Sequence, residues 1–159
     1  MRPPAGDDHE RNFLEIVDRH GWHVMLVYGD DTGPGFAYST GIYERTGRPE
    51  LIVFGLKPKV SHFVVNDYAE RTIKGESFEV GRRYEDFLEG SLLTFLSVTD
   101  RAVLSEYMTW TSWYYQGSNY PIFQGVWPDK KTGAFPWEPG FAQDLLERQP
   151  LLAPSPSVH

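Results

Sequence analysis

The chain has 159 residues and a formal net charge of −7, from 22 acidic and 15 basic side chains. A chain of this size folds as one domain around one core. Its acidity argues against nucleic acid as a partner, because phosphate backbones are bound by clustered lysines and arginines. There is no cysteine, which excludes disulfides, thiolate nucleophiles and zinc sites with cysteine ligands.

We expect neither a signal peptide nor a membrane span in this chain. The first residues, MRPPAGDDHERNF, lack the apolar segment of a signal peptide, and no run approaches the roughly 20 apolar residues of a membrane span. We therefore expect a cytoplasmic protein without a membrane partner. Residues 1–6 and 153–159 are expected to be disordered, with residues 7–152 forming a single domain.

One helix and three strands are predicted in the first third of the chain. Residues 7–21 have helical apolar spacing and end at Gly21. Residues 22–28, WHVMLVY, are almost continuously apolar, which is typical of a central strand covered on both faces. Residues 36–43, FAYSTGIY, and residues 50–56, ELIVFGL, follow as two further strands. The short turns between these strands predict an antiparallel meander.

The rest of the chain alternates helices with strands. Pro58 begins a helix that ends at Gly75. A short strand is predicted at 78–80, and full strands at 91–98, SLLTFLSV, and 122–127, IFQGVW. Between the two full strands the spacing predicts one continuous helix, with an apolar face made of Val103, Tyr107, Trp110 and Tyr114. A short helix is expected before Pro150.

These elements predict an α+β fold in a single domain. Five to six strands form a largely antiparallel sheet, either open or closed like a barrel, and the helices pack against it. There is no internal repeat and no interdomain linker.

Five sequence blocks follow one another along nearly the whole chain, from about Gly21 to Leu152: GWHVMLV, PGFAYSTGIY, RPELIVFGL, QGVWPDKKTGAFPWE and QPLL. In their order and spacing the chain resembles the bacterial domain of unknown function 4262 family. The resemblance implies a single-domain member of that family. It carries over no catalytic residue, because the family's activity is not established.

An aromatic segment stiffened by prolines, residues 123–140, is the main candidate for a binding surface. Aromatic rings beside polar side chains are typical of small-ligand pockets. We predict that this segment and residues 38–41 bound one pocket for a small organic ligand. The binding residues expected there are Tyr38, Ser39, Thr40, Gln124, Trp127, Asp129 and Trp137.

Whether the protein is an enzyme is left open by the sequence. If the ligand is turned over, His23 and Glu50 are the candidate catalytic residues, because both can transfer protons. Glu50 starts a buried strand, where burial would raise its pKa. Tyr38 and Asp129 would then orient the substrate.

Other chemistries have less support. The pair His20 and His23 resembles a metal-ligand spacing, but Gly21 breaks the helix on which the two rings would converge, so no metal is expected. Ser39 lies outside any G-x-S-x-G motif, which argues against a serine nucleophile. No glycine-rich phosphate loop or G-x-G-x-x-G motif occurs.

Two functions other than small-ligand binding are also compatible with the sequence. The aromatic segment could anchor a protein partner, in which case Trp127 or Trp137 would be strongly exposed. The protein could instead bind a flavin, since three strands followed by a proline-started helix resemble the opening of split-barrel flavin-binding proteins. Lys57 and Lys59, at the start of that helix, would then meet the phosphate. The sequence requires no cofactor.

Overall fold

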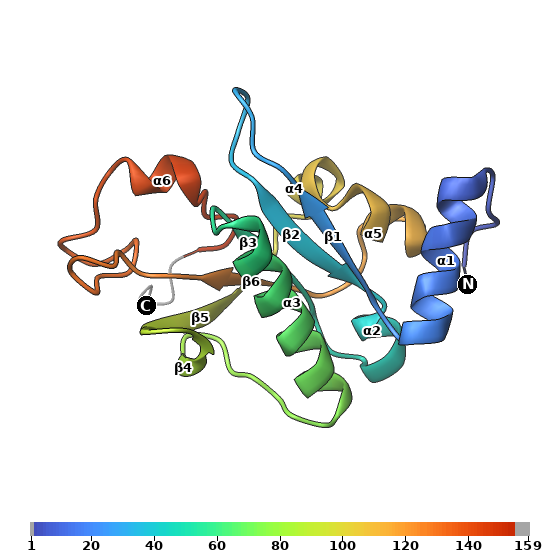
Figure 1. Cartoon of the computed structure of the whole chain (residues 1–159), viewed down its shortest axis with the longest axis horizontal. Coiled ribbons are helices and arrows are strands. Elements are labelled where there is room, and N and C mark those ends of the chain that lie inside the picture. Colours follow the sequence, from blue (N-terminus) through green and yellow to red (C-terminus); the bar gives the residue numbers. More distant parts are fainter. Residues whose placement is uncertain (1, 155–159) are drawn as a thin grey trace.

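The computed structural model describes residues 2–154, in which six strands form one mixed sheet of order β1-β2-β3-β6-β5-β4 (Figure 1). The strands are β1 (His23–Val27), β2 (Phe36–Thr40), β3 (Glu50–Phe54), β4 (Arg83–Leu88), β5 (Ser91–Ser97) and β6 (Ile122–Val126). The helices are α1 (Asp8–His20), α2 (Ile42–Thr46), α3 (Pro58–Ile73), α4 (Arg101–Tyr107), α5 (Thr109–Tyr114) and α6 (Leu145–Arg148). The predicted α+β class is confirmed. The sheet is open, so the barrel alternative was wrong.

Strands β1, β2 and β3 form the predicted antiparallel meander. Strand β6, however, inserts between β3 and β5 and runs parallel to β3, with Glu50 beside Ile122 and Val53 beside Gly125. Local sequence does not encode this pairing, because β3 and β6 are separated by α3, β4, β5, α4 and α5.

Four local predictions need correction. Strand β1 lies at the sheet edge and its five residues are only half-buried, so it is not a central strand. Gly41, at φ 112°, ends β2 and begins α2, where one long strand was expected. The short strand predicted at 78–80 is only an isolated bridge at Val80, and the strand that pairs with β5 at the second sheet edge is β4, residues 83–88. The predicted continuous helix is divided into α4 and α5 at Met108.

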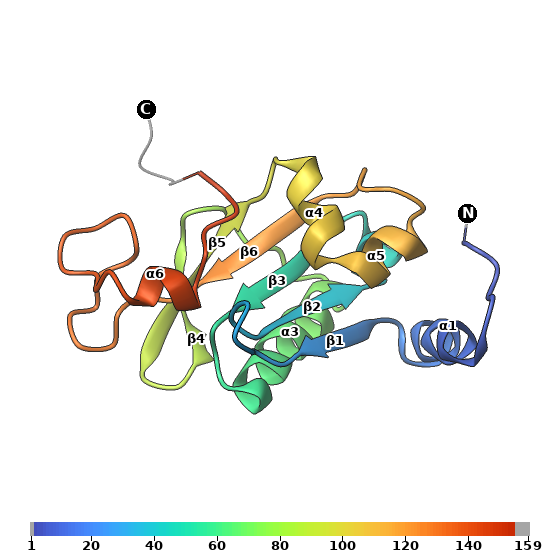
Figure 2. The same ribbon diagram turned by 90° about the horizontal axis from the view of Figure 1, so that it is seen from above.

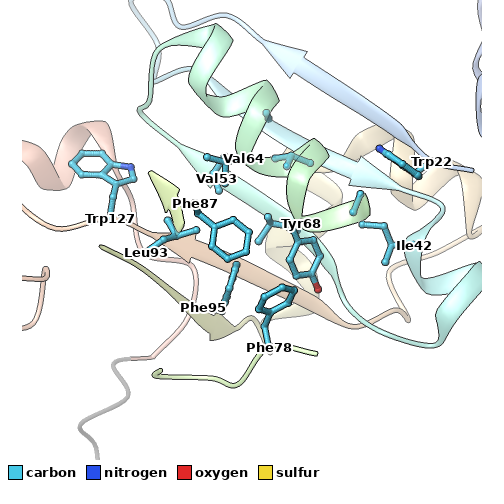
Figure 3. Close-up of a cluster of buried hydrophobic side chains, with 14 residues drawn as sticks. Trp22, Ile42, Val53, Val64, Tyr68, Phe78, Phe87, Leu93, Phe95 and Trp127 are labelled. Carbon is cyan, nitrogen blue, oxygen red and sulfur yellow. The ribbon is translucent and has the colours of Figure 1, made fainter. Parts of the chain in front are cut away.

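Helix α3 covers one face of the sheet, while α4 and α5 cover the other (Figure 2). The first face carries a cluster rich in aromatic rings, with Trp127 at one end and Trp22 at the other (Figure 3). The second face carries a separate cluster that includes Tyr38, Ile52 and Phe135. Side chains from alternate positions of each strand therefore supply two cores, where the length of the chain predicted one.

The ends of the described chain contact the domain. Arg2 forms ion pairs with Asp18 and Glu44, and Pro3 is buried. Ala153 is also buried. Met1 and residues 155–159, where disorder was predicted, lie outside the described residues. No helix within residues 2–154 combines the length and apolar character that a membrane span needs.

Two buried glutamines fasten the C-terminal segment to the sheet. The side chain of Gln149 accepts a hydrogen bond from the backbone N–H of Trp127 and donates one to its carbonyl, both at 2.9 Å. Gln124 in turn donates to the carbonyl of Pro150 and accepts from the N–H of Leu152, both at 2.8 Å. This segment therefore follows β6 closely, and it brings the carbonyl of Arg148 against Gly55.

The contact at Gly55 gives a test of this packing. Gly55 and Gly47 have nearly the same φ, 77° and 76°, but a Cβ at Gly55 would lie 2.3 Å from the Arg148 oxygen, whereas one at Gly47 would meet nothing within 4 Å. We expect Gly47→Ala to lower the free energy of unfolding by about 1–2 kcal/mol through backbone strain alone. Gly55→Ala should cost about 1–3 kcal/mol more, from steric overlap. Urea denaturation of both variants measures the difference; equal losses would contradict the described packing.

Candidate functional site

Tyr38 and Trp127, one from each of the two segments predicted to share a pocket, lie on opposite faces of the sheet. Tyr38 is 1% exposed and belongs to the cluster under α4 and α5, where its hydroxyl accepts a hydrogen bond from the Trp110 N–H at 3.2 Å. Trp127 is 6% exposed and belongs to the cluster under α3. Phe135 and Trp137 pack in the same cluster as Tyr38, but residues 38–41 line neither of the cavities described below.

The remaining polar residues of β2 are also enclosed. Thr40 shares a hydrogen bond of 2.7 Å with the hydroxyl of Thr111 in α5, and the same Thr111 hydroxyl lies 2.9 Å from the carbonyl oxygen of Ser39. Gln124 is fully buried and holds the C-terminal segment. Ser39, Thr40 and Gln124 thus connect elements of the fold, and none of them lines either cavity described below.

Glu50 is the most enclosed charged group of the predicted site, with a relative exposure of 0%. Its carboxylate accepts hydrogen bonds from the backbone N–H groups at the start of α2: Gly41 at 3.0 Å, Ile42 at 3.3 Å and Tyr43 at 3.0 Å. The hydroxyls of Ser39 and Tyr115 also donate to it. Burial raises the pKa of Glu50 above its ordinary value, although the hydrogen bonds from Tyr115 and Ser39 oppose the rise.

This arrangement makes Glu50 the cap of α2 and a junction between β2, β3 and Tyr115, the residue that caps the end of α5. All five partners donate to the carboxylate, and an anion at a helix N-terminus is favoured by the helix dipole. Glu50 therefore has a structural role in this geometry, and it lines neither cavity.

Replacing Glu50 by glutamine should destabilise the fold strongly. The amide nitrogen would present hydrogens to groups that are themselves donors, leaving buried polar groups unsatisfied. We expect Glu50→Gln to lower the free energy of unfolding by about 3 kcal/mol or more. Glu85→Gln, at an exposed position of β4, should change it by less than about 0.5 kcal/mol. Chemical denaturation compares the two; a small loss in both variants would exclude the capping role.

His23 lies on β1 with its ring 4.3 Å from the ring of Phe13, centroid to centroid. Its Nδ1 atom is buried and has no hydrogen-bond partner within the described part of the chain. Burial, followed by the charge of His62, lowers the pKa of His23 from 6.5 to about 4. The imidazole is therefore neutral at physiological pH, and it lines neither cavity.

The lowered pKa of His23 predicts a loss of stability in acid. Between pH 6.5 and about pH 4, the unfolded chain binds a proton at His23 and the folded chain does not, so acidification favours unfolding. We expect His23→Phe, which keeps an aromatic ring against Phe13, to reduce the stability lost over this interval by about 1–2 kcal/mol, allowing for the partial exposure of His23. The same substitution at His9, an exposed position of α1, is the matched control. Denaturation series at several pH values test this, and parallel curves for wild type and His23→Phe would contradict it.

The aromatic segment after β6 is a well-bonded loop. One oxygen of the Asp129 side chain accepts from the N–H of Lys131 at 2.9 Å, and the other accepts from the N–H of Ala142 at 3.1 Å. These bonds, first that from Lys131, hold the pKa of Asp129 below its ordinary value. The Trp127 indole donates to the Phe54 carbonyl at 2.7 Å. Asp129 and Trp127 thus shape the loop and attach it to the end of β3.

Trp137 lies further along this loop and is partly buried. Its ring stacks on the ring of Phe135 at a centroid distance of 5.4 Å, and the guanidinium of Arg83 covers the Phe135 ring at 4.3 Å. Arg83 also pairs with Glu138 at 2.6 Å. The loop is therefore attached to β4 as well as to β3.

A cavity of about 730 Å³ opens beside this loop. Its walls are the start of α3, the β4–β5 hairpin and parts of residues 127–148, a segment that Figure 1 shows at the end of the molecule away from α1. The apolar side chains on its wall include Leu56, Val60, Leu88, Trp127 and Leu145. A neighbouring cavity of about 180 Å³ shares Leu56 and Arg148 with it.

The larger cavity differs in charge from the chain as a whole. Four basic residues line it, Lys57, Lys130, Lys131 and Arg148, against three acids, Glu89, Asp129 and Asp144. Among residues 2–154 none of the four basic side chains forms an ion pair with a carboxylate. Both oxygens of Asp129 already accept backbone N–H groups. The balance at this cavity is thus slightly basic in a chain with a net charge of −7.

The start of α3 adds to this potential. Lys57 caps the helix without a side-chain hydrogen bond, and the first turn contains no acidic residue. The positive end of the helix dipole is therefore not compensated by a nearby carboxylate on this helix. Of the predicted binding residues, Trp127 and Asp129 line the cavity. Lys57, a candidate phosphate ligand in the flavin alternative, lines it as well. Val60, Leu88 and Arg148 were missed, because they carry no local motif and converge only through the sheet order.

The chain belongs to the DUF4262 family, a domain of unknown function, whose model matches residues 16–142. That match includes the cavity residues from Leu56 to Ala142 and ends before those of α6. No curated protein and no solved structure matches the chain. The resemblance predicted from the five sequence blocks is confirmed.

Proposed function

We propose that this protein binds a small organic anion in the larger cavity between α3, the β4–β5 hairpin and the loop after β6. The observation that carries the proposal is the cavity itself, with a volume of about 730 Å³, an apolar wall and four basic side chains. Ligand sites typically have volumes of about 300–1,000 Å³ and combine mainly apolar linings with a few polar groups that orient the ligand.

The lining suggests how such a ligand is held. Leu56, Val60 and Leu88 offer apolar contacts to a hydrocarbon or aromatic part. Lys57 and Arg148, which both line this cavity, offer positive charge to a carboxylate, sulfonate or phosphate. We propose no reaction, because Glu50 and His23, the expected proton-transfer groups, do not reach this cavity.

The two alternatives, a protein-anchoring loop and a flavin site, have less support. A protein-anchoring aromatic loop requires strong exposure of Trp127 or Trp137, but Trp127 is 6% exposed and Trp137 is partly buried against Phe135. The flavin alternative was based on a split barrel, and the sheet is open. A cytoplasmic location and the lack of a nucleic-acid partner stay predictions from the sequence.

Charge reversal at one of two neighbouring lysines tests the proposed site. Lys57 lines the cavity and Lys59 does not, although both lie at the start of α3. We expect Lys57→Glu to weaken binding of naphthalene-1-sulfonate about fivefold or more, and Lys59→Glu to weaken it clearly less. Isothermal titration calorimetry gives both dissociation constants, and circular dichroism confirms that each variant is folded.

Two results would contradict the proposal. One is the absence of binding to naphthalene-1-sulfonate, phenyl phosphate and benzoate by the wild-type protein. The other is an equal loss of affinity in Lys57→Glu and Lys59→Glu, which would indicate only a long-range effect of net charge. Visible absorption of the purified protein separately tests for flavin.

A further inference from the structure

The two edge strands of the sheet differ in how they are protected. Strand β4, RYEDFL, carries three charged residues and an irregular register with β5 between Tyr84 and Leu88. Charges and bulges of this kind prevent edge strands from pairing with other chains. Strand β1, HVMLV, has no Lys, Arg, Asp, Glu or Pro, and it pairs with β2 without interruption from His23 to Val27. It is therefore an unprotected edge.

The outer side of β1 is available for pairing. Among the described residues no strand lies beyond β1 in the sheet, and Figure 2 shows α1 at its end. In an antiparallel pair, alternate residues direct their backbone N–H and C=O groups away from the partner strand. All five side chains of β1 remain half-buried, so a strand added here would cover apolar surface as well as satisfy backbone groups.

We propose that β1 of one molecule pairs antiparallel with β1 of a second copy, extending the sheet through a twofold dimer. A twofold axis at Met25 would give complete overlap of the five residues, with His23 opposite Val27 and Val24 opposite Leu26. Every one of these pairs is free of carboxylate and of Lys or Arg. Twofold interfaces of this type are self-complementary and are the commonest symmetry of homo-oligomers.

Charges at the two ends of β1 favour this partner. The C-terminal turn of α1, just before β1, carries the basic residues Arg19 and His20. The turn just after β1 carries Asp30 and Asp31, both exposed. Antiparallel pairing about the strand centre brings the acidic end of one copy to the basic end of the other, twice per dimer. A parallel arrangement would instead place like charges together.

An exposed aromatic residue beside β1, Tyr28, also fits an interface at this edge of the sheet. Tyr28 directly follows β1 and is 71% exposed. In the proposed dimer it would lie near the start of the partner copy's β1. The Arg19 side chain is 84% exposed and forms only a long ion pair with Glu15, at 3.9 Å, so its guanidinium remains accessible to a second molecule. None of these residues lines the larger cavity, so this dimer and the proposed anion site stand or fall separately.

A charge-swap experiment tests the dimer. Sedimentation equilibrium of the wild-type protein should show a monomer–dimer equilibrium. Asp31→Lys and Arg19→Glu should each raise the dimer dissociation constant about tenfold, because each converts two attractions into two repulsions. An equimolar mixture of the two variants should pair as a heterodimer within about threefold of the wild-type constant, since one contact then keeps its native charges and the other is attractive again with its charges exchanged. Glu106→Lys, an equivalent charge change at an exposed position of α4, should have little effect.

Hydrogen exchange locates the interface independently. Raising the protein concentration should slow exchange of the outward backbone amides of β1 and leave those of the other edge strand, β4, unchanged. A wild-type protein that stays monomeric at its highest soluble concentration would overturn the proposal. So would a dimer whose dissociation constant ignores both charge variants, or whose protected amides lie outside β1.

Discussion

The parallel pairing of β3 with β6 decides where the later segments of the chain lie. Because the two strands run in the same direction, their carboxyl ends lie side by side, and there the Trp127 indole donates to the Phe54 carbonyl. The helix that follows β3 and the loop that follows β6 therefore start side by side. Strand β5, on the far side of β6, brings the β4–β5 hairpin to the same place. The larger cavity lies among these three segments, at the carboxyl ends of the parallel pair, where open sheets with such strands commonly bind ligands.

Several polar residues that suggested chemistry instead hold this arrangement together. Glu50 is enclosed and accepts five hydrogen bonds that join β2, α2 and α5 to β3. Gln124 and Gln149 exchange hydrogen bonds with backbone groups across the junction between β6 and the C-terminal segment. A buried polar group is costly unless it is fully bonded, so each of them favours one arrangement of its neighbours over alternatives.

Local patterns predicted the elements whose signals lie within a few residues. Gly21 ends α1, Pro58 begins α3, and β3 is buried throughout, as expected. The errors have physical causes. The apolar run of β1 is compatible with an edge strand packed between helices as well as with a central strand. The strand β4 was not predicted because its charged residues do not resemble a strand pattern, although it pairs with β5. The continuous helical spacing across α4 and α5 did not reveal the break at Met108, because spacing reports only which side chains share a face.

The sequence by itself determined the α+β class, the family, most of the helices and strands, and the aromatic content of the cores, because these depend on local spacing, capping and composition. Only the tertiary structure decided that Tyr38 and Trp127 face opposite ways, that Glu50 is a cap, and that Lys57 meets Arg148 and Leu88 at one cavity. The physical reason is that β6 finds its place through side-chain packing and backbone pairing with strands distant in the chain. The residue spacing within β6 or within its partner strands does not indicate which strands will pair.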